Sequence, residues 1–383
     1  MSNLDTMVLE LKSRNVRRIH VLAWRDLEDP DAGGSEIHAD AFMSRWQEAG
    51  LDIVHRTSAA AGLPSTAQRH GYEVIRRGGR MTVFPRTAVS ELARRMGTFD
   101  ALVEIWNGVP WLSPLWCRRP RLLVYHHVHG PMWDQVFPAP IAAVGRLVET
   151  KLAPPWYRST PTVTLSNDSY EEMVHLGWPK KNLHIAPAGV EPFFSPGESR
   201  SEYPSVVAVG RLAPVKRFEA LLEQIAITRR RVPNVTLTIV GEGPERQHLE
   251  TWIRSHQAQD WITLAGRISQ EQLRSLYRRS WLITSASLTE GWGLTLTEAA
   301  GCGTPAVATD VGGHRSSVLH EKTGRLAPLN SLGETLADVL LDHTSRQALG
   351  IAAEKRARTL SWDLLAEQVL APLHLEVVRK QTH

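Results

Sequence analysis

One stretch decides the fold of this sequence: Glu290-Gly291-Trp292-Gly293-Leu294-Thr295-Leu296-Thr297-Glu298. It directly follows a predicted strand and begins a predicted helix, so its order is strand, glycine loop, helix. Gly291 and Gly293 permit the backbone to approach a ligand closely. The amides of Gly293, Leu294 and Thr295 are expected at the helix N-terminus, an end that attracts phosphate. The stretch therefore predicts a phosphate site at the carboxyl end of a strand.

Two carboxylates frame this loop, Glu290 within it and Glu298 one to two turns into the helix. A carboxylate can accept two hydroxyl hydrogen bonds at once. The pair therefore suits a ligand with sugar hydroxyls on both sides of a diphosphate. The alternative is that Glu290 is only a turn residue and Glu298 only a solvated helix carboxylate.

Outward from this stretch, short β-branched runs alternate with amphipathic segments of helix length, a pattern typical of parallel α/β sheets. The expected strands are 18–23, 51–54, 72–75, 101–105, 121–125, 161–165, 206–209, 235–240, 262–264, 282–284 and 306–309. Residues 191–204 lack periodicity and are rich in proline, which indicates a linker. We therefore expect two Rossmann-like domains, 1–195 and 200–364. A last helix, about 365–383, is free to pack back onto the first domain.

Two such domains joined by a short linker face each other across a cleft between the carboxyl ends of their sheets, where ligands bind in these folds. Arg211 and Lys216 follow the first strand of the second domain. Two cations there would neutralise a leaving diphosphate, and ordinary loop solvation is the alternative. In the first domain, Gly33 and Gly34 precede a helix and can bring backbone amides to the same diphosphate.

The chain resembles retaining glycosyltransferases of family 4, which have the two-domain glycosyltransferase B fold. The blocks that carry the resemblance cover nearly the whole chain: residues 33–36, 187–191, 209–212 with Lys216, 240–244, 290–298, 301–305 and 323–326. The resemblance implies that domain 1–195 binds the acceptor and domain 200–364 the nucleotide sugar. It also implies that Glu290 contacts donor-sugar hydroxyls and Glu298 the nucleotide ribose. Arg211 and Lys216 would hold the diphosphate of a donor expected to be a UDP-sugar. We expect the same donor site to include Trp292, Gly266 and Arg267.

Three histidines end a predicted strand in Tyr125-His126-His127-Val128-His129. The resemblance places a histidine beside the donor sugar, and His126 fits that position best. If the strand continues, His127 points to the opposite face and is a core histidine. His127, His129 and Trp133 are the candidates for the acceptor side. A metal site with Asp134 is the alternative, but the spacing does not match a helical zinc motif, so we expect no metal and no other cofactor.

The composition excludes several classes of protein. The 383 residues contain two cysteines, Cys117 and Cys302, far apart in sequence, which fits a reducing compartment such as the cytoplasm. Neither a signal peptide nor a membrane-spanning run is evident. The net charge of +4 comes with no nucleic-acid recognition motif, so we expect no nucleic-acid partner. Weak peripheral association with an anionic membrane face stays open.

Other templates are missing or altered. The third glycine of a dinucleotide fingerprint, a phosphate-binding loop and a Gly-x-Ser-x-Gly elbow are all lacking. In the loop that follows Gly312-Gly313, Ser316 stands where the family usually has a glutamate. This difference weakens the role expected of that loop. The acidic loop 25–31 is expected to be solvated, with contact to a polar or cationic acceptor as the alternative.

The sequence thus predicts a retaining glycosyltransferase that moves a hexose from a nucleotide sugar to an acceptor hydroxyl by a same-face mechanism. A nucleotide-sugar 2-epimerase or a phosphorylase of the same fold is the enzymatic alternative. A catalytically silent nucleotide-sugar binding module is the alternative from another class. The acceptor and the oligomeric state are not specified by the sequence.

Overall fold

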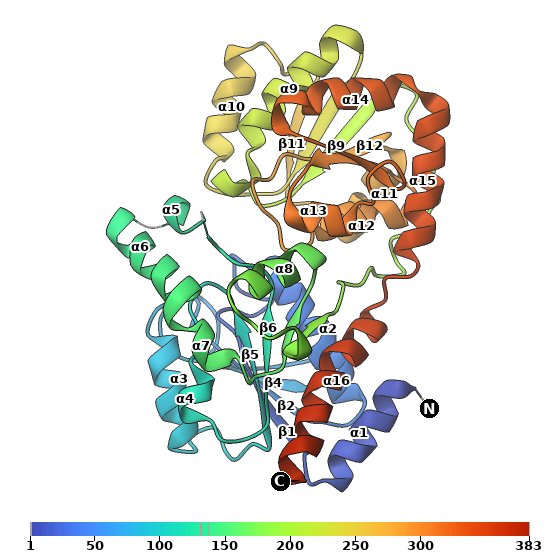
Figure 1. The fold of residues 1–383 in the computed structure, drawn as a ribbon. Coiled ribbons are helices and arrows are strands. Elements are labelled where there is room, and N and C mark those ends of the chain that lie inside the picture. The colour runs from blue at the N-terminus through green and yellow to red at the C-terminus, as the bar shows by residue number, and fades with distance from the viewer. Residues whose placement is uncertain (1, 131, 137, 383) are drawn as a thin grey trace. The chain divides into compact units, whose positions relative to one another are not determined.

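The computed structural model describes residues 2–130, 132–136 and 138–382, and they form two compact units. Unit 1 comprises Met1–Gly189 and Trp362–His383, and unit 2 comprises Val190–Ser361. Each unit is built on a largely parallel sheet flanked by helices (Figure 1), which is the expected α/β class. No helix among the described residues is long and apolar enough to cross a bilayer.

The sheet of unit 1 has the strand order β3-β4-β2-β1-β5-β6-β7-β8, and all neighbours except β3 and β4 are parallel. Its strands are β1 (Arg18–Leu22), β2 (Asp52–Thr57), β3 (Thr66–Arg69), β4 (Tyr72–Arg76), β5 (Ala101–Trp106), β6 (Arg121–Tyr125), β7 (Thr162–Thr164) and β8 (Leu183–Ile185). Its helical segments are α1 (Asn3–Ser13), α2 (Gly34–Glu48), α3 (Val83–Leu92), α4 (Ser113–Trp116), α5 (Met132–Val136), α6 (Ala139–Leu147), η1 (Val148–Leu152), α7 (Pro154–Tyr157), α8 (Asn167–His175), η2 (Lys180–Asn182) and α16 (Trp362–Gln381).

The C-terminal helix α16 belongs to unit 1, where it packs against α1 and α2 (Figure 1). The indole Nε1 of Trp46 on α2 donates a hydrogen bond of 3.0 Å to the carbonyl of Ala366 on α16. Leu365, Val369 and Leu373 are fully buried along this helix. Residues near the end of the chain therefore complete the core of the unit in which the chain begins.

The sheet of unit 2 is parallel throughout, in the order β11-β10-β9-β12-β13-β14. Its strands are β9 (Ser205–Val209), β10 (Thr236–Val240), β11 (Ile262–Gly266), β12 (Leu282–Ser285), β13 (Ala306–Thr309) and β14 (Gly324–Ala327). Its helical segments are η3 (Pro214–Lys216), α9 (Phe218–Arg231), α10 (Arg246–Ser255), α11 (Gln270–Arg279), α12 (Leu294–Gly301), α13 (Gly312–Ser317), η4 (Leu329–Ser331), α14 (Leu332–Leu341) and α15 (His343–Ala357).

Strand β9 explains the layering of unit 2. Val206 and Ala208 face a core shared with α9, α10 and α14, whereas Val207 faces a second core shared with α11 and α12. Because successive strand residues point to opposite faces, a strand that is apolar at every position is buried on both sides. The expected strands 121–125 and 306–309 coincide with β6 and β13.

The sequence predicted a strand at 72–75, which corresponds to β4, but it did not predict β3 or the hairpin that the two strands form. Thr66–Arg69 is short and polar, and its residues alternate between exposed and half-buried, so it has little strand signal. The turn is made by His70 and Gly71, both with positive φ (46° and 85°), as in a two-residue antiparallel hairpin.

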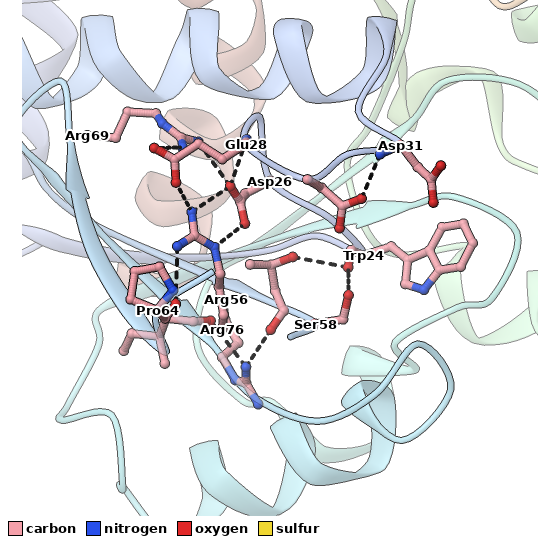
Figure 2. A network of polar contacts seen from close by, with 12 residues as sticks. Trp24, Asp26, Glu28, Asp31, Arg56, Ser58, Pro64, Arg69 and Arg76 are labelled. Carbon is pink, nitrogen blue, oxygen red and sulfur yellow. Dashed lines mark hydrogen bonds and ion pairs between the residues drawn. The ribbon is translucent and has the colours of Figure 1, made fainter. Parts of the chain in front are cut away.

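The acidic loop 25–31 is not simply solvated, and that prediction is wrong. Asp26 and Asp29 are almost fully buried. Figure 2 shows Arg69 and Arg76 converging on Asp26 and Glu28. Arg76 contacts both carboxylate oxygens of Asp26, with Nε···Oδ2 at 2.6 Å and Nη2···Oδ1 at 2.9 Å.

Ion pairing sets the charge of this loop. Burial alone would raise the pKa of Asp26, but hydrogen bonds from Arg76 and from the amide of Glu28 lower it to about 2. Arg80 likewise binds both oxygens of Asp29 and lowers its pKa despite burial. The loop between β1 and α2 is therefore clamped by arginines from or beside the β3–β4 hairpin.

Replacing Arg76 with Met should lower the free energy of unfolding by about 3 kcal/mol, because it leaves the buried Asp26 carboxylate short of its main partner. Urea unfolding measures this loss. The matched control is R231M, which breaks exposed ion pairs to Glu334 and Asp338 and should cost much less stability than R76M. Equal losses in the two variants would contradict a buried ionic clamp.

Candidate functional site

The loops at the carboxyl edge of the unit 2 sheet bring Lys216 and Glu290 together. Lys216 ends η3 after β9, and Glu290 follows β12. Their side chains form an ion pair in which Lys216 Nζ donates to Glu290 Oε1. The hydroxyl of Ser287 donates to the same oxygen at 2.8 Å. Two predicted site residues 74 positions apart thus meet in one cluster.

Glu290 is ionised at neutral pH. Burial alone would raise its pKa, but the charge of Lys216 and hydrogen bonds from Lys216 and Ser287 lower it to about 2. Its side chain stays 15% exposed, so the carboxylate can still be reached by a ligand. It can accept hydroxyl hydrogen bonds without taking up a proton.

Helix α13 packs against the loop that carries Glu290. The amide of Gly313 donates 2.9 Å to the Glu290 carbonyl. His314 is buried, and its Nδ1 lies 2.8 Å from the Thr309 carbonyl. Burial lowers its pKa, so the imidazole is neutral near the Glu290 carboxylate. The sequence pattern missed both His314 and Ser287, although each follows a strand at the sheet edge where functional groups gather.

Helix α12 begins where the glycine loop predicted it. Gly293 caps the helix with φ 97°, a conformation that favours glycine, and Leu294 is the first helical residue. The first amides of a helix have no partner inside the helix, so those of Leu294 and Thr295 are free to bind an anion. The Trp292 side chain is buried, while Gly291 is half-buried.

Glu298 lies on the second turn of α12 and differs from Glu290 in its charge. It accepts a hydrogen bond of 3.0 Å from the hydroxyl of Tyr277, which the sequence pattern missed. Burial raises its pKa to about 7 against the opposing effect of that hydrogen bond. Unlike Glu290, it has no cation among its hydrogen-bond partners in the described chain. It is a half-buried group poised to change charge near neutral pH.

Arg211, Gly266 and Arg267 lie at the ends of β9 and β11 but outside the Lys216–Glu290 cluster. Arg211 is exposed, whereas the cation paired with Glu290 is Lys216. Gly266 has φ 67° and faces the Glu242 carboxylate, and Arg267 is exposed. Both arginines are thus accessible at the same edge of the sheet.

In unit 1, the histidine segment follows β6, which ends at Tyr125, so His127 does not continue the strand as the core interpretation required. His127 is half-buried and stacks on His129 with ring centroids 4.8 Å apart. His126 is buried, and its Nε2 lies 3.3 Å from Nδ1 of His38. Burial, with the neighbouring histidines, lowers the pKa of His126 to about 3, so this imidazole is neutral.

Glu149, at the start of η1, organises the segment after His126. Its carboxylate accepts hydrogen bonds from the Tyr125 hydroxyl (2.8 Å), the His129 amide (2.9 Å), the Gly130 amide (3.1 Å) and the Trp133 indole (3.0 Å). Burial alone would raise its pKa, but hydrogen bonds and charge from His129 lower it to about 2. Two candidate acceptor residues, His129 and Trp133, are therefore held by one buried carboxylate that no sequence motif signalled.

Gly33 and Gly34 are exposed at the start of α2. The amide of Gly33 donates 2.7 Å to Glu36, whose other oxygen accepts from Arg25. The Gly33 amide is therefore already used inside the chain. Among the described residues, no group of three or more His, Cys, Asp and Glu side chains is arranged to hold a metal ion.

Comparison with known proteins places this geometry in context. Residues 190–356, most of unit 2, match the family Glycosyl transferases group 1. Over 366 residues the chain is 26% identical to the GDP-mannose-dependent alpha-(1-6)-phosphatidylinositol monomannoside mannosyltransferase of Mycobacterium tuberculosis, covering 88% of this chain and 89% of that protein.

A shorter match has a different donor in its name. Over 116 residues the chain is 38% identical to a UDP-N-acetylglucosamine–peptide N-acetylglucosaminyltransferase subunit of Streptococcus parasanguinis, covering 30% of this chain and 22% of that protein. Among solved structures, sucrose-phosphate synthase from Thermosynechococcus elongatus superposes with a TM-score of 0.79 at 20% identity, covering 96% and 99% of the two chains. That likeness shows the fold, the expected glycosyltransferase B architecture.

Replacing Glu298 with Gln should remove a pH dependence of stability. The pKa of this carboxyl is about 7 in the folded chain against an ordinary value of 4.5. Between these values the folded chain holds a proton that the unfolded chain has released, so stability falls as pH rises. From about pH 5 to about pH 7.5, wild type should lose about 2 kcal/mol more than E298Q.

Urea unfolding followed by tryptophan fluorescence measures this difference. E334Q, at an exposed carboxylate of the same unit, is the control and should keep the wild-type slope. Identical slopes in wild type and E298Q would show that Glu298 titrates at its ordinary value.

Proposed function

The chain belongs to the group 1 glycosyltransferases, and we propose that it moves a hexose from a nucleoside diphosphate sugar to an acceptor hydroxyl with retention of anomeric configuration. The observation that carries the proposal is the Lys216–Glu290 pair beside the N-terminus of α12. It combines a cation, an ionised carboxylate and unpaired helix amides at one sheet edge.

Each part has a task in this reaction. Lys216, Arg211 and the first amides of α12 stabilise the negative charge that develops on the leaving diphosphate. The ionised Glu290 accepts hydrogen bonds from hydroxyls of the donor sugar. Glu298 accepts hydrogen bonds from the ribose hydroxyls, and its negative form is the better acceptor.

Transfer proceeds on one face of the sugar. The acceptor oxygen bonds to the anomeric carbon while the bond from that carbon to the diphosphate oxygen breaks. The electron pair stays on the diphosphate, whose oxygen takes the proton of the acceptor hydroxyl. Glu290 is tied to Lys216 and Ser287, which supports a binding role for it rather than that of a covalent nucleophile.

Unit 1 supplies the acceptor side in this proposal. The neutral His126 donates or accepts a hydrogen bond at the donor sugar, and His127, His129 and Trp133 contact the acceptor. Glu149 fixes His129 and Trp133 in place. The reaction needs no metal in this scheme, since protein cations and helix amides neutralise the diphosphate.

The donor is proposed to be a UDP-sugar, with GDP-mannose as the competing candidate. The relative that covers most of the chain is named as GDP-mannose-dependent, whereas the streptococcal relative is named for UDP-N-acetylglucosamine. We also propose that the enzyme acts in the cytoplasm, because Cys117 and Cys302 are both free and buried.

Incubation with UDP- and GDP-sugars and a panel of hydroxyl acceptors should give a glycoside with the anomeric configuration of the donor. Proton NMR of the product assigns the anomer, and release of free nucleotide identifies the base. An inverted anomer would contradict the proposal. Formation of an epimerised donor in the absence of acceptor would indicate a 2-epimerase. A reaction that depends on inorganic phosphate would indicate a phosphorylase, and nucleotide-sugar binding without turnover would indicate a silent binding module.

Replacing Lys216 with Met should lower kcat/KM about 100-fold, because a cation beside the leaving diphosphate is lost and Glu290 loses its partner. Initial-rate kinetics with the donor found above measure the loss. K322M, at an exposed lysine of unit 2, is the control and should keep wild-type kinetics. Full activity in K216M would remove Lys216 from the mechanism.

A further inference from the structure

Large exposed apolar side chains gather on one flank of unit 1. We name this surface the basic apolar flank and define it by three segments, residues 83–95, 113–119 and 139–159. Its exposed large apolar residues are Val89 and Leu92 on α3, Leu115 on α4, Ile141, Val144 and Leu147 on α6, Leu152 on η1 and Trp156 on α7. Contiguous exposed apolar surface on this scale marks an interaction site.

These helices follow one another in contact (Figure 1). Helix α4 packs against both α3 and α7, α7 contacts η1, and η1 continues α6. Ile141, Val144 and Leu147 recur at helical spacing on the outer side of α6, while Ala142 on its inner side is buried. The helical segments that carry the exposed apolar side chains therefore adjoin one another on unit 1.

The charges on this surface have one sign. The basic apolar flank exposes Arg86, Arg94, Arg95, Arg118, Arg119, Lys151 and Arg158. Its carboxylates, Glu91 and Glu149, are both buried, Glu91 against His20 and Glu149 beneath His129. Arg146, which is partly exposed, forms an ion pair with Asp134 of the neighbouring helix α5. These three fully described segments thus expose cations and apolar groups but no carboxylate.

We infer that the basic apolar flank docks the protein onto the surface of an anionic lipid bilayer. Apolar side chains of a surface helix enter the headgroup boundary while Lys and Arg bind anionic lipids. Trp156 suits that boundary because its ring is amphipathic. A surface that binds a protein partner typically has an apolar core with few charges, or charges of both signs. The basic apolar flank has neither feature.

Docking extends the proposed function by placing the unit with the acceptor residues at a lipid surface. It does not depend on the donor, the acceptor or turnover. Vesicle binding is measured without any sugar, so its failure leaves the transfer reaction untouched, and an inactive enzyme can still bind vesicles.

The protein, residues 1–383, is mixed with sedimenting vesicles of phosphatidylcholine alone or with about 30% phosphatidylglycerol. The bound fraction should rise with phosphatidylglycerol and fall as NaCl goes from about 0.1 M to about 0.5 M. No binding to the anionic vesicles at the lower salt would overturn the inference. Binding that ignores both lipid charge and salt would overturn it as well.

Two double variants locate the surface. K151E/R158E should weaken binding to anionic vesicles on the order of tenfold, since each cation near such a surface contributes substantially. L152S/W156S removes apolar groups that are 55% and 54% exposed and should also weaken binding. The control L341S/I351S changes residues of unit 2 that are 56% and 63% exposed and should bind as wild type.

Equal binding by wild type and both flank variants would place the membrane contact elsewhere and refute the inference. Circular dichroism of each variant establishes that the fold is kept, and all four substituted flank positions are exposed. Loss of binding in the unit 2 control as well would mean that the assay reports general surface stickiness, which also counts against the flank.

Discussion

A close approach of two backbones sets the geometry of the site in unit 2. A Cβ placed on Gly313 would lie 2.5 Å from the carbonyl oxygen of Glu290, so no side chain fits there. The amide of Gly313 instead donates to that carbonyl. The loops after β12 and β13 are thereby locked together, and the Glu290 side chain is held where Ser287 and Lys216 both reach it. A catalytic geometry supported on rigid backbone keeps its alignment without a ligand.

The same stretch of chain holds two carboxyl groups in opposite states. Glu290 has a pKa of about 2 and Glu298 a pKa of about 7, although eight positions separate them. Both are buried enough for desolvation to favour the neutral acid, and the difference comes from the partner. Lys216 offsets desolvation at Glu290, whereas the neutral hydroxyl of Tyr277 offsets it only in part at Glu298. One stretch of chain therefore presents a permanently charged carboxylate and a titrating one, and the roles proposed for them at the sugar and at the nucleotide use this difference.

Sequence alone predicted those parts of the molecule whose signal is local. The strand, glycine loop and helix order of residues 290–298 needs no distant partner, and the β-branched runs of β6 and β13 are set by burial on both faces. The clamp on Asp26 could not be predicted, because its arginines lie 43 and 50 positions away on a hairpin with a weak strand pattern. Glu149 was missed for a related reason. A single carboxylate in a helical segment looks solvated until the fold turns it inward.

The distribution of charge carries more information than its sum. The chain has 44 basic and 40 acidic residues, a small excess. Arg69, Arg76 and Arg80 are balanced by the carboxylates of the β1–α2 loop, and Lys216 is balanced by Glu290. Where carboxylates are turned inward, as Glu91 and Glu149 are, the outer face keeps its cations uncompensated. Burying a carboxylate therefore does two things in this fold: it fixes the structure beneath and leaves a positive surface above, and that surface is where an anionic partner gains the most from electrostatic attraction.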